Sequence, residues 1–293
     1  MSADVNTRDA VVSVALARSS NLAMLPETAL RVLRLADDPD VTMARLAEVI
    51  ATSPELCARI LRIVNSAFYG FPGEVRSIER ATTLMGLESV RNVTIAASLT
   101  RVFQGRALSP RFSPRDLWTH SVSVATATRL LALAVQPRLA EEAFLAGILH
   151  DIGLMMELQM DRLKLATLIG QIEASQSVDL LTAEEGLFGA THQDFGAALL
   201  TAWHLPSTLA VAAQYHHHPR RLPPGHAFMP TLVHVADRLV ITSGAPFLLE
   251  DPPTDIDDAV LDVLKVTRAQ LDEVRGVLPD ATREIQSILQ GPS

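Results

Sequence analysis

The sequence predicts an all-α protein, and three observations lead to this prediction. Apolar residues recur at the spacing of one helix face, and no alternating run of useful length indicates a strand. Apolar residues make up 48% of the chain and are mostly alanine, leucine and valine, whereas aromatic residues make up only 4%. This balance favours helices over sheets. Helix start signals, in which a side-chain oxygen can accept a backbone hydrogen bond, occur at Thr42, Ser53, Ser113 and Thr267.

Residues 8–106 are expected to form a helical lobe. Thr42 should cap a helix over residues 43–51. Ser53 is followed by Pro54, which suits the first helical position because that position needs no backbone N–H. A loop with several aromatic residues follows at 68–73. The other helices expected in this lobe cover residues 8–20, 26–35 (starting at Pro26), 78–85 and 87–103.

A second helical lobe is expected over residues 107–245. Ser113 and Asp116 form a capping-box pattern that starts a helix running to Val135. Pro137 should end this helix, because proline cannot continue one. The later helices are expected at residues 141–149, 154–175, 180–188, from 191 onward, 206–215 and 230–243, with a proline-rich loop at 220–230.

Residues 246–293 are expected to form an acidic linker and two closing helices. The stretch 250–258 is rich in acidic residues and proline, as solvated linkers often are. Thr267 and Gln270 have the spacing of a capping box and should start the last helix. Pro279 lies inside that helix and is expected to kink or split it.

Composition excludes several functional classes. The net charge of −8 argues against a surface for nucleic acid, so direct nucleic-acid binding is not expected. The single cysteine, Cys57, rules out an internal disulfide and fits a reducing cytoplasm. The N-terminus does not resemble a secretory signal, and no uncharged apolar stretch reaches the roughly 18 residues that a membrane span needs. We therefore expect a cytoplasmic protein without a membrane anchor.

One short stretch, Gly147-Ile-Leu-His150-Asp151-Ile-Gly153, is the candidate functional centre. A histidine and an aspartate stand together in an apolar run, so both are expected to be buried. A buried carboxylate without a partner costs several kcal/mol, which favours a cation or hydrogen-bond donors beside it. Imidazole and carboxylate together suit iron, manganese or zinc. The alternative is a helix-end pair whose polar atoms are satisfied by the backbone.

Three longer stretches resemble a known family. The first runs from Ser53 through Asn65-Ser66-Ala67-Phe68-Tyr69-Gly70, followed by Ile78-Glu-Arg-Ala and Leu84-Met-Gly86-Leu87. The second joins Leu117-Trp118-Thr119-His120-Ser121 with the His150-Asp151 stretch. The third is Glu185-x-x-x-Gly189-x-x-His192-x-x-x-Gly196, then Trp203-x-Leu205-Pro206 and His216-His217. Over residues 20–240 the chain resembles HDOD proteins, the HD-related output domains of bacterial signalling, within the HD superfamily of metal-dependent phosphohydrolases.

The resemblance implies a two-lobed helical fold whose second lobe is HD-like and holds a metal site. It assigns seven ligands to this site, enough for two ions that share a bridging carboxylate. Asp151 would be the bridge. One ion would take His120, His150 and Asp237, and the other His192, His216 and His217.

The resemblance also implies a regulatory output module that acts through a signalling protein partner, and HDOD proteins are generally regarded as non-catalytic. The alternative is a metal-dependent phosphohydrolase, with Asp151 at its catalytic centre, acting on a nucleotide or cyclic dinucleotide. The chain fills every superfamily ligand position, which supports the alternative. It departs from the cyclic-di-GMP-hydrolysing HD-GYP relatives at Leu154, where they carry lysine, and at His218-Pro219-Arg220, where the Gly-Tyr-Pro triplet is missing. A nucleotide remains open as a small-molecule ligand.

Two further predictions concern residues outside the seven. His218 is expected to be a solvated loop residue, whereas His234, one turn before Asp237, either lines the site or packs within its helix. The aromatic residues Phe68, Tyr69 and Phe71 form either an exposed protein interface or packing between the lobes. We expect packing between the lobes, because the chain has few other large side chains to fill a junction.

Overall fold

The computed structural model describes residues 2–18, 27–36, 38, 40–175, 178–243 and 256–290. The predicted helix start at Pro26, the last two residues of the helix expected at 8–20, and residues 250–255 of the expected acidic linker lie outside these ranges.

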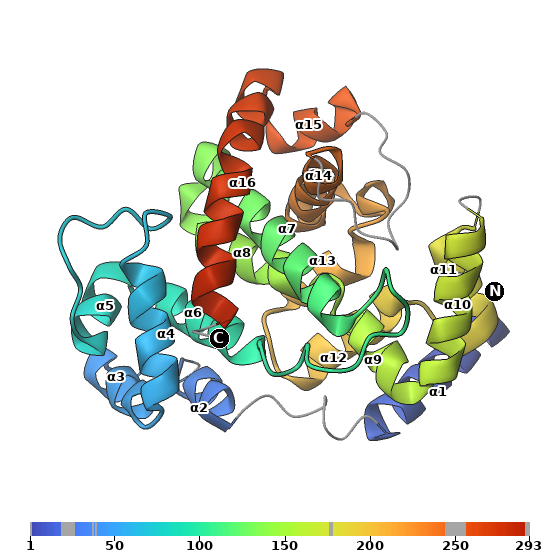
Figure 1. Cartoon of the computed structure of the whole chain (residues 1–293), viewed down its shortest axis with the longest axis horizontal. Coiled ribbons are helices and arrows are strands. Elements are labelled where there is room, and N and C mark those ends of the chain that lie inside the picture. The colour runs from blue at the N-terminus through green and yellow to red at the C-terminus, as the bar shows by residue number, and fades with distance from the viewer. Residues whose placement is uncertain are drawn as a thin grey trace.

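The described residues form helices and contain no strand, which confirms the predicted all-α class (Figure 1). Two residues, Ser109 and Phe112, form one isolated β-bridge in a loop. The helices are α1 (Ser2–Arg18), α2 (Glu27–Ala36), α3 (Met43–Ala51), α4 (Pro54–Val64), α5 (Ile78–Met85), α6 (Leu87–Leu99), α7 (Pro114–Val135), α8 (Ala140–Leu149), α9 (Ile152–Met160), α10 (Arg162–Ala174), α11 (Leu180–Phe188), α12 (His192–Ala202), α13 (Ser207–Tyr215), α14 (Phe228–Thr242), α15 (Asp258–Leu264) and α16 (Arg268–Gln290), with short 3-10 turns at Pro137–Leu139, Pro219–Arg221 and Pro224–His226.

The predicted helix caps are present. The hydroxyl groups of Thr42, Ser53 and Ser113 each accept a hydrogen bond from the backbone N–H three residues later. At the start of α16 the Thr267 N–H donates to Gln270 Oε1 at 2.9 Å, and the Gln270 N–H donates back to Thr267 Oγ1 at 3.2 Å. Local sequence therefore sets these helix starts, because each cap satisfies backbone donors that the helix itself leaves unpaired.

Two predicted helices have different ends. The helix expected over 154–175 is two helices, α9 and α10, because Asp161 adopts an extended conformation between them. Its carboxylate accepts hydrogen bonds from the N–H groups of Leu163 at 3.0 Å and Lys164 at 3.1 Å, which caps α10. The helix expected over 87–103 ends earlier, at Leu99.

Two prolines interrupt helices less than expected. Helix α16 runs through Pro279 without a break, so Pro279 does not split it, and the alternative of a kink at this residue stays a prediction. Pro279 is exposed, and water can therefore satisfy the carbonyl group that loses its partner one turn earlier. Helix α14 begins at Phe228, two residues before Pro230, since proline is tolerated within the first turn.

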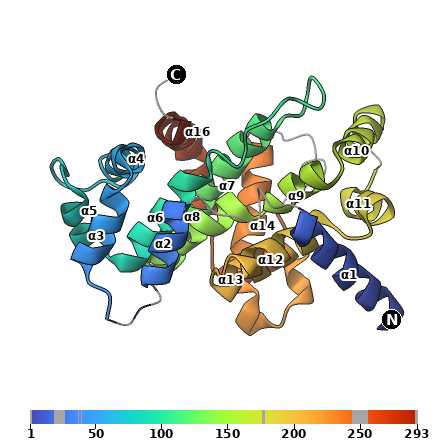
Figure 2. The ribbon, with the colours of Figure 1, turned by 90° about the horizontal axis from the view of Figure 1, so that it is seen from below.

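The helices gather into two regions joined by long elements. Helices α2 to α6 lie at one end of the molecule, and α6 contacts α8 in the other region. Helix α16 packs along α7 and also touches α4, so the C-terminal helix spans both regions (Figures 1 and 2). Helix α1 lies at the opposite end from α2, against α9 and α12. The predicted boundaries at residues 106 and 245 stay predictions.

The aromatic loop after α4 packs against α7 and α8, as expected. The Phe68 ring lies 6.1 Å from the Phe144 ring of α8. The Arg129 guanidinium of α7 stands 4.3 Å from the centroids of both Phe68 and Tyr69. Arg129 Nε donates to Glu141 Oε1 at 2.9 Å, and the Tyr69 hydroxyl donates to the other oxygen of Glu141. We call Phe68, Tyr69, Arg129 and Glu141 the junction cluster.

One stretch, Pro137–Met160, is long and apolar enough to cross a membrane by length and composition. In this structure 83% of its apolar window is buried inside the protein, which is the environment of a core helix.

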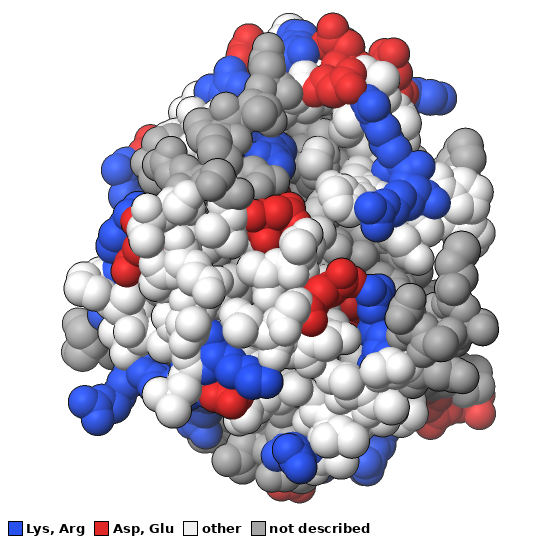
Figure 3. Space-filling view, turned by 90° about the vertical axis from the view of Figure 1, so that its right-hand side faces the viewer, with Lys and Arg blue, Asp and Glu red and all other residues white. Residues whose placement is uncertain are grey.

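Figure 3 shows the side of the molecule that carries α10 and α11. Basic and acidic side chains of the described residues are intermixed on that face.

Candidate metal centre

Six helices bring the seven predicted ligands to one place. His120 lies in α7 and Asp237 in α14. His150 and Asp151 occupy the junction between α8 and α9, and His192 is the first residue of α12. The pair His216-His217 follows α13. All are buried except His217, which is half-buried.

Two glycines explain the Gly147 to Gly153 pattern. A Cβ atom on Gly147 would lie 2.5 Å from Ala125 Cα of α7, and one on Gly153 would lie 1.9 Å from the His192 carbonyl oxygen. No side chain fits at either position. The glycines therefore let α8 approach α7 and let α9 approach the start of α12, which brings His150 and Asp151 close to His120 and His192.

The donor atoms form two groups that share Asp151. Asp151 Oδ2 lies 3.1 Å from His150 Nε2 and 3.8 Å from His120 Nε2. Asp151 Oδ1 lies 3.3 Å from His216 Nε2 and 3.5 Å from His192 Nε2.

The remaining two residues extend these groups. His217 Nε2 lies 3.2 Å from His192 Nε2. Asp237 Oδ1 lies 3.2 Å from His120 Nε2. Within each of the groups His120–His150–Asp151 and Asp151–His192–His216–His217, the donor atoms lie within 4.8 Å of one another. The buried cluster can therefore hold a metal ion.

Several atoms of this cluster have no hydrogen-bond partner among the described residues. They are both oxygens of Asp151, Oδ1 of Asp237 and Nε2 of His150, and all are buried. An unpaired buried carboxylate is costly in free energy, whereas a divalent cation between these atoms would satisfy them together. Imidazole nitrogen and carboxylate oxygen are donors that iron, manganese and zinc accept. The residues present thus fit the metal that the sequence predicts.

The outward-facing ring nitrogens orient the imidazoles. His150 Nδ1 lies 2.7 Å from the Gly147 carbonyl, and His216 Nδ1 lies 2.8 Å from the Ala213 carbonyl. Because a carbonyl only accepts, both Nδ1 atoms carry the hydrogen. In the neutral form of each ring, Nε2 therefore presents its lone pair to the centre, which is the tautomer that a metal requires.

Glu184 contacts a predicted ligand and was not predicted from the sequence. This carboxylate of α11 is fully buried, lies 2.8 Å from His192 Nδ1, and accepts from the His192 backbone N–H at 2.9 Å. It fixes both the ring and the backbone of one ligand. The neighbouring Glu185 is exposed and pairs with Arg8 instead. The only feature in the sequence that could have indicated this role is the pair Glu184-Glu185 in a largely apolar helix. The pair alone does not show which carboxylate points inward.

Charge is distributed unevenly in the metal-free centre. Burial opposes protonation of His150, but the adjacent Asp151 carboxylate overrides it and raises the pKa of His150 to about 9. Burial lowers the pKa of His216 to about 4, and burial with the neighbouring imidazoles also lowers the pKa of His217. At neutral pH, His216 and His217 are therefore ready to bind a cation, whereas an ion must displace a proton from His150.

The histidines outside the set of seven have other environments. His218 is exposed, as expected, and so are His204 and His226. His234 is half-buried, and its Nδ1 lies 2.8 Å from the His216 carbonyl oxygen. It therefore steadies the backbone of a ligand, and it lines a cavity together with His217.

The family model of the HDOD domain matches residues 22–219. An uncharacterized protein of Treponema pallidum (strain Nichols) is 24% identical over 216 residues, which are 73% of this chain and 41% of that protein. The chain thus spans about two fifths of the length of this curated relative.

Several solved structures share the fold. An HDOD domain protein of unknown function from Geobacter sulfurreducens matches with a TM-score of 0.78 and 22% identity, covering 97% of this chain and 99% of that chain. A protein from Marinobacter aquaeolei VT8, provisionally named for signal transduction, has a TM-score of 0.76 and 24% identity over 98% of this chain and 66% of its own. A provisionally named phosphohydrolase from Shewanella amazonensis SB2B has a TM-score of 0.69 and 24% identity over 94% and 98%. With the family model covering more than half of its residues, the chain belongs to the HDOD domain family.

Proposed function

We propose that this protein is a cytoplasmic regulatory module that binds a divalent metal in its HD-like region and acts through a protein partner. The observation that carries the proposal is that all seven predicted ligands lie together around Asp151, whose two buried oxygens form no hydrogen bond of good geometry among the described residues. The family membership and the signalling name of one structural neighbour support a regulatory role. A bound ion supplies the positive charge that these carboxylates and imidazoles lack.

The same helices that carry ligands also carry the junction cluster. Helix α7 holds both His120 and Arg129, and α8 holds Glu141 and leads directly into His150. The junction cluster in turn holds the loop after α4 through the Phe68 carbonyl, which accepts from an Arg129 Nη1 hydrogen at 3.0 Å. Fixing α7 and α8 at the centre would therefore restrict the loop that connects α4 to α5. A partner that contacts this loop would sense whether metal is bound.

The test is the substitution Asp151→Asn, with His218→Ala as the matched control. Asp151→Asn keeps the side-chain shape but removes the charge that two groups of ligands share, so metal content should fall to background. His218→Ala removes an exposed histidine and should leave metal content unchanged. Elemental analysis of protein purified without chelator should find iron, manganese or zinc in near-stoichiometric amount in wild type and His218→Ala.

Thermal denaturation provides an independent measurement. A ligand that binds only the folded state stabilises it by about 2.7 kcal/mol when its free concentration is a hundred times the dissociation constant. Chelator should therefore lower the melting temperature of wild type and His218→Ala and leave Asp151→Asn almost unchanged. Wild type without metal, and with a melting temperature insensitive to chelator, would show that the centre is vestigial.

A second candidate function, metal-dependent phosphohydrolase, is supported by one pocket. A cavity of about 400 Å³ is lined by His217, Arg220, Arg221 and Arg238, beside the half-buried edge of the centre. Guanidinium groups near a two-ion site suit a phosphoester substrate. Arg220 also pairs with Asp257, and the guanidinium groups of Arg221 and Arg238 line the same cavity.

Turnover decides between the two candidates. Metal-loaded wild type would be assayed with a panel of nucleotides and cyclic dinucleotides. Cleavage that is abolished in Asp151→Asn and weakened in Arg238→Gln would establish the phosphohydrolase. A metal-loaded protein without turnover on the panel, which binds a defined signalling partner, would support the regulatory module.

A further inference from the structure

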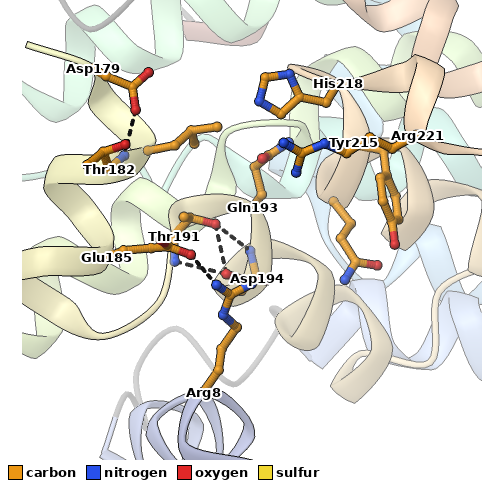
Figure 4. Close-up of a pocket in the computed structure, with 12 residues that line it drawn as sticks. Arg8, Asp179, Thr182, Glu185, Thr191, Gln193, Asp194, Tyr215, His218 and Arg221 are labelled. Carbon is orange, nitrogen blue, oxygen red and sulfur yellow. Dashed lines mark hydrogen bonds and ion pairs between the residues drawn. The ribbon is translucent and has the colours of Figure 1, made fainter. Parts of the chain in front are cut away.

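A second pocket lies beside the metal centre and contains none of the seven ligands. It has a volume of about 510 Å³ and is bounded by α1, α11, the start of α12, the end of α13 and the turn that carries His218 and Arg221 (Figure 4). Its volume falls within the range of pockets that bind small molecules, roughly 300–1,000 Å³.

One end of this pocket has unused hydrogen-bond donors. Gln193 is 6% exposed, and its buried Nε2 has no hydrogen-bond partner among the described residues. Arg221 makes no ion pair within the described part of the chain, and His218 is exposed beside it. In Figure 4 the side chains of Gln193 and Arg221 extend toward each other beneath the His218 ring. A buried amide donor without a partner is rare enough in folded proteins to require an explanation.

The acidic residues of the pocket are already engaged. Glu185 pairs with Arg8. The Asp194 carboxylate accepts from the Thr191 N–H at 3.0 Å and from the Thr191 hydroxyl at 2.9 Å. Asp179, across the pocket from Arg221, accepts from the Thr182 N–H at 2.8 Å. The polar groups near Gln193 that still lack a partner are therefore hydrogen-bond donors. The carboxylates on the other side of the pocket would repel a second negative group on a ligand.

We propose that this pocket binds a small molecule with one anionic head group, a carboxylate or a phosphate, and a neutral or cationic remainder. Arg221 supplies the charge, and the Gln193 amide supplies a directed hydrogen bond to an oxygen of the head group. The His218 ring closes the third side. This site is separate from the metal centre and does not depend on an ion being bound.

The proposed site lies next to two chain segments that carry predicted metal ligands, and this position suits a regulatory role. Gln193 directly follows His192, and Arg221 lies in the turn that begins at His218, immediately after His217. An anion held by both residues would connect two chain segments that carry ligands of the same group. The pocket is therefore suited to receive a chemical signal next to the metal.

The experiment uses melting temperature and two probes. Sodium chloride is exchanged for sodium phosphate or sodium acetate at constant ionic strength and pH with the full-length protein. A probe at about ten times its dissociation constant should raise the melting temperature of wild type by about 2–4 °C. Gln193→Met and Arg221→Met should lose the rise. Arg220→Met is the matched control, because Arg220 lines only the other cavity, and it should keep the rise.

The possible outcomes distinguish a phosphate from a carboxylate head group, and binding in this pocket from binding at the metal. A rise with phosphate alone assigns a phosphate head group, and a rise with acetate alone assigns a carboxylate. No rise with either probe, or an equal rise in all four proteins, which is a general salt effect, overturns the site. A rise that disappears in Asp151→Asn places the anion on the metal, which also overturns the site but leaves the proposed function intact. A rise in wild type that elemental analysis finds without metal as purified keeps the site, and that metal content contradicts the proposed metal function.

Discussion

The junction cluster and the metal centre are both buried polar clusters built on α7 and α8, yet they are satisfied in opposite ways. In the junction cluster, Arg129 donates to Glu141 and to the Phe68 carbonyl, and Tyr69 donates to the second oxygen of Glu141. In the metal centre, imidazole nitrogens lie 3.1 to 3.8 Å from the oxygens of Asp151, yet neither oxygen accepts a hydrogen bond of good geometry within the described residues.

This difference separates a structural cluster from a binding site. Buried charges persist in folded proteins when other groups compensate them. The junction cluster obtains all of that compensation from protein atoms. The metal centre obtains only part of it, from the protonated His150 beside Asp151. Substitutions in the first cluster should therefore lower stability whether or not metal is bound, whereas those in the second should act through metal affinity.

The largest effect on stability should come from Arg129→Met. The substitution leaves the Glu141 carboxylate, whose side chain is 15% exposed, without its cation, and breaking a buried pair costs about 3–5 kcal/mol. Chemical denaturation should show this loss in chelator-treated protein as well as in metal-loaded protein, because every partner in the cluster is a protein group.

A double variant controls for side-chain volume. Arg129→Met combined with Glu141→Met removes both charges, so it should be less destabilised than Arg129→Met alone. If Arg129→Met loses stability only when metal is present, the junction cluster is not self-sufficient and the comparison fails.

Sequence alone predicted the helical class and most helix starts, and the seven residues that it proposed as metal ligands lie close together in the structure. Helix caps such as Thr42 and Ser53 are local, since the hydroxyl and the N–H that it accepts from are three residues apart. The seven ligands were predicted only through the resemblance to a family, because they come from segments more than a hundred residues apart. The close approach at Gly153 shows that the ligand positions depend on packing between helices.

The missed features depend on tertiary contacts. Asp161 breaks a long apolar pattern through a side chain that competes for backbone N–H groups, and a helical period hides such a break. Glu184 lies on the buried side of α11, and Glu185 lies on its exposed side. Which of the two is buried depends on where α12 packs. Whether Asp151 is satisfied by the backbone or needs an ion was likewise open from the sequence, because the answer requires the positions of six other side chains.

A smaller effect should follow from Glu184→Gln, which tests the support of the metal centre. The amide keeps the shape of the carboxylate but removes the charge that orients His192, and loss of such a group typically lowers metal affinity by roughly 10- to 100-fold. Glu185→Gln is the matched control, because the adjacent carboxylate is exposed and faces Arg8. Metal titration with a competing chelator measures both. Equal affinities for the two variants would mean that Glu184 is merely a core residue.

The smallest effect should come from Tyr69→Phe, which removes one hydrogen bond from the junction cluster. Loss of a single hydrogen bond of this kind costs about 1 kcal/mol. The size of the effect should also depend on pH, because burial and the Glu141 carboxylate raise the pKa of the Tyr69 hydroxyl well above its ordinary value.

The sign of this pH dependence follows from where the proton is held. An unfolded tyrosine ionises near pH 10, whereas folded Tyr69 keeps its proton to higher pH, so its contribution to stability is complete below about pH 10 and declines above it. The difference in unfolding free energy between wild type and Tyr69→Phe should therefore shrink as the pH rises from 8 to 11, as measured by urea denaturation. Chelator should leave this difference unchanged. A difference that stays constant with pH would mean that the Tyr69 hydroxyl is solvated, and the junction cluster would then rest on Arg129 and Glu141 alone.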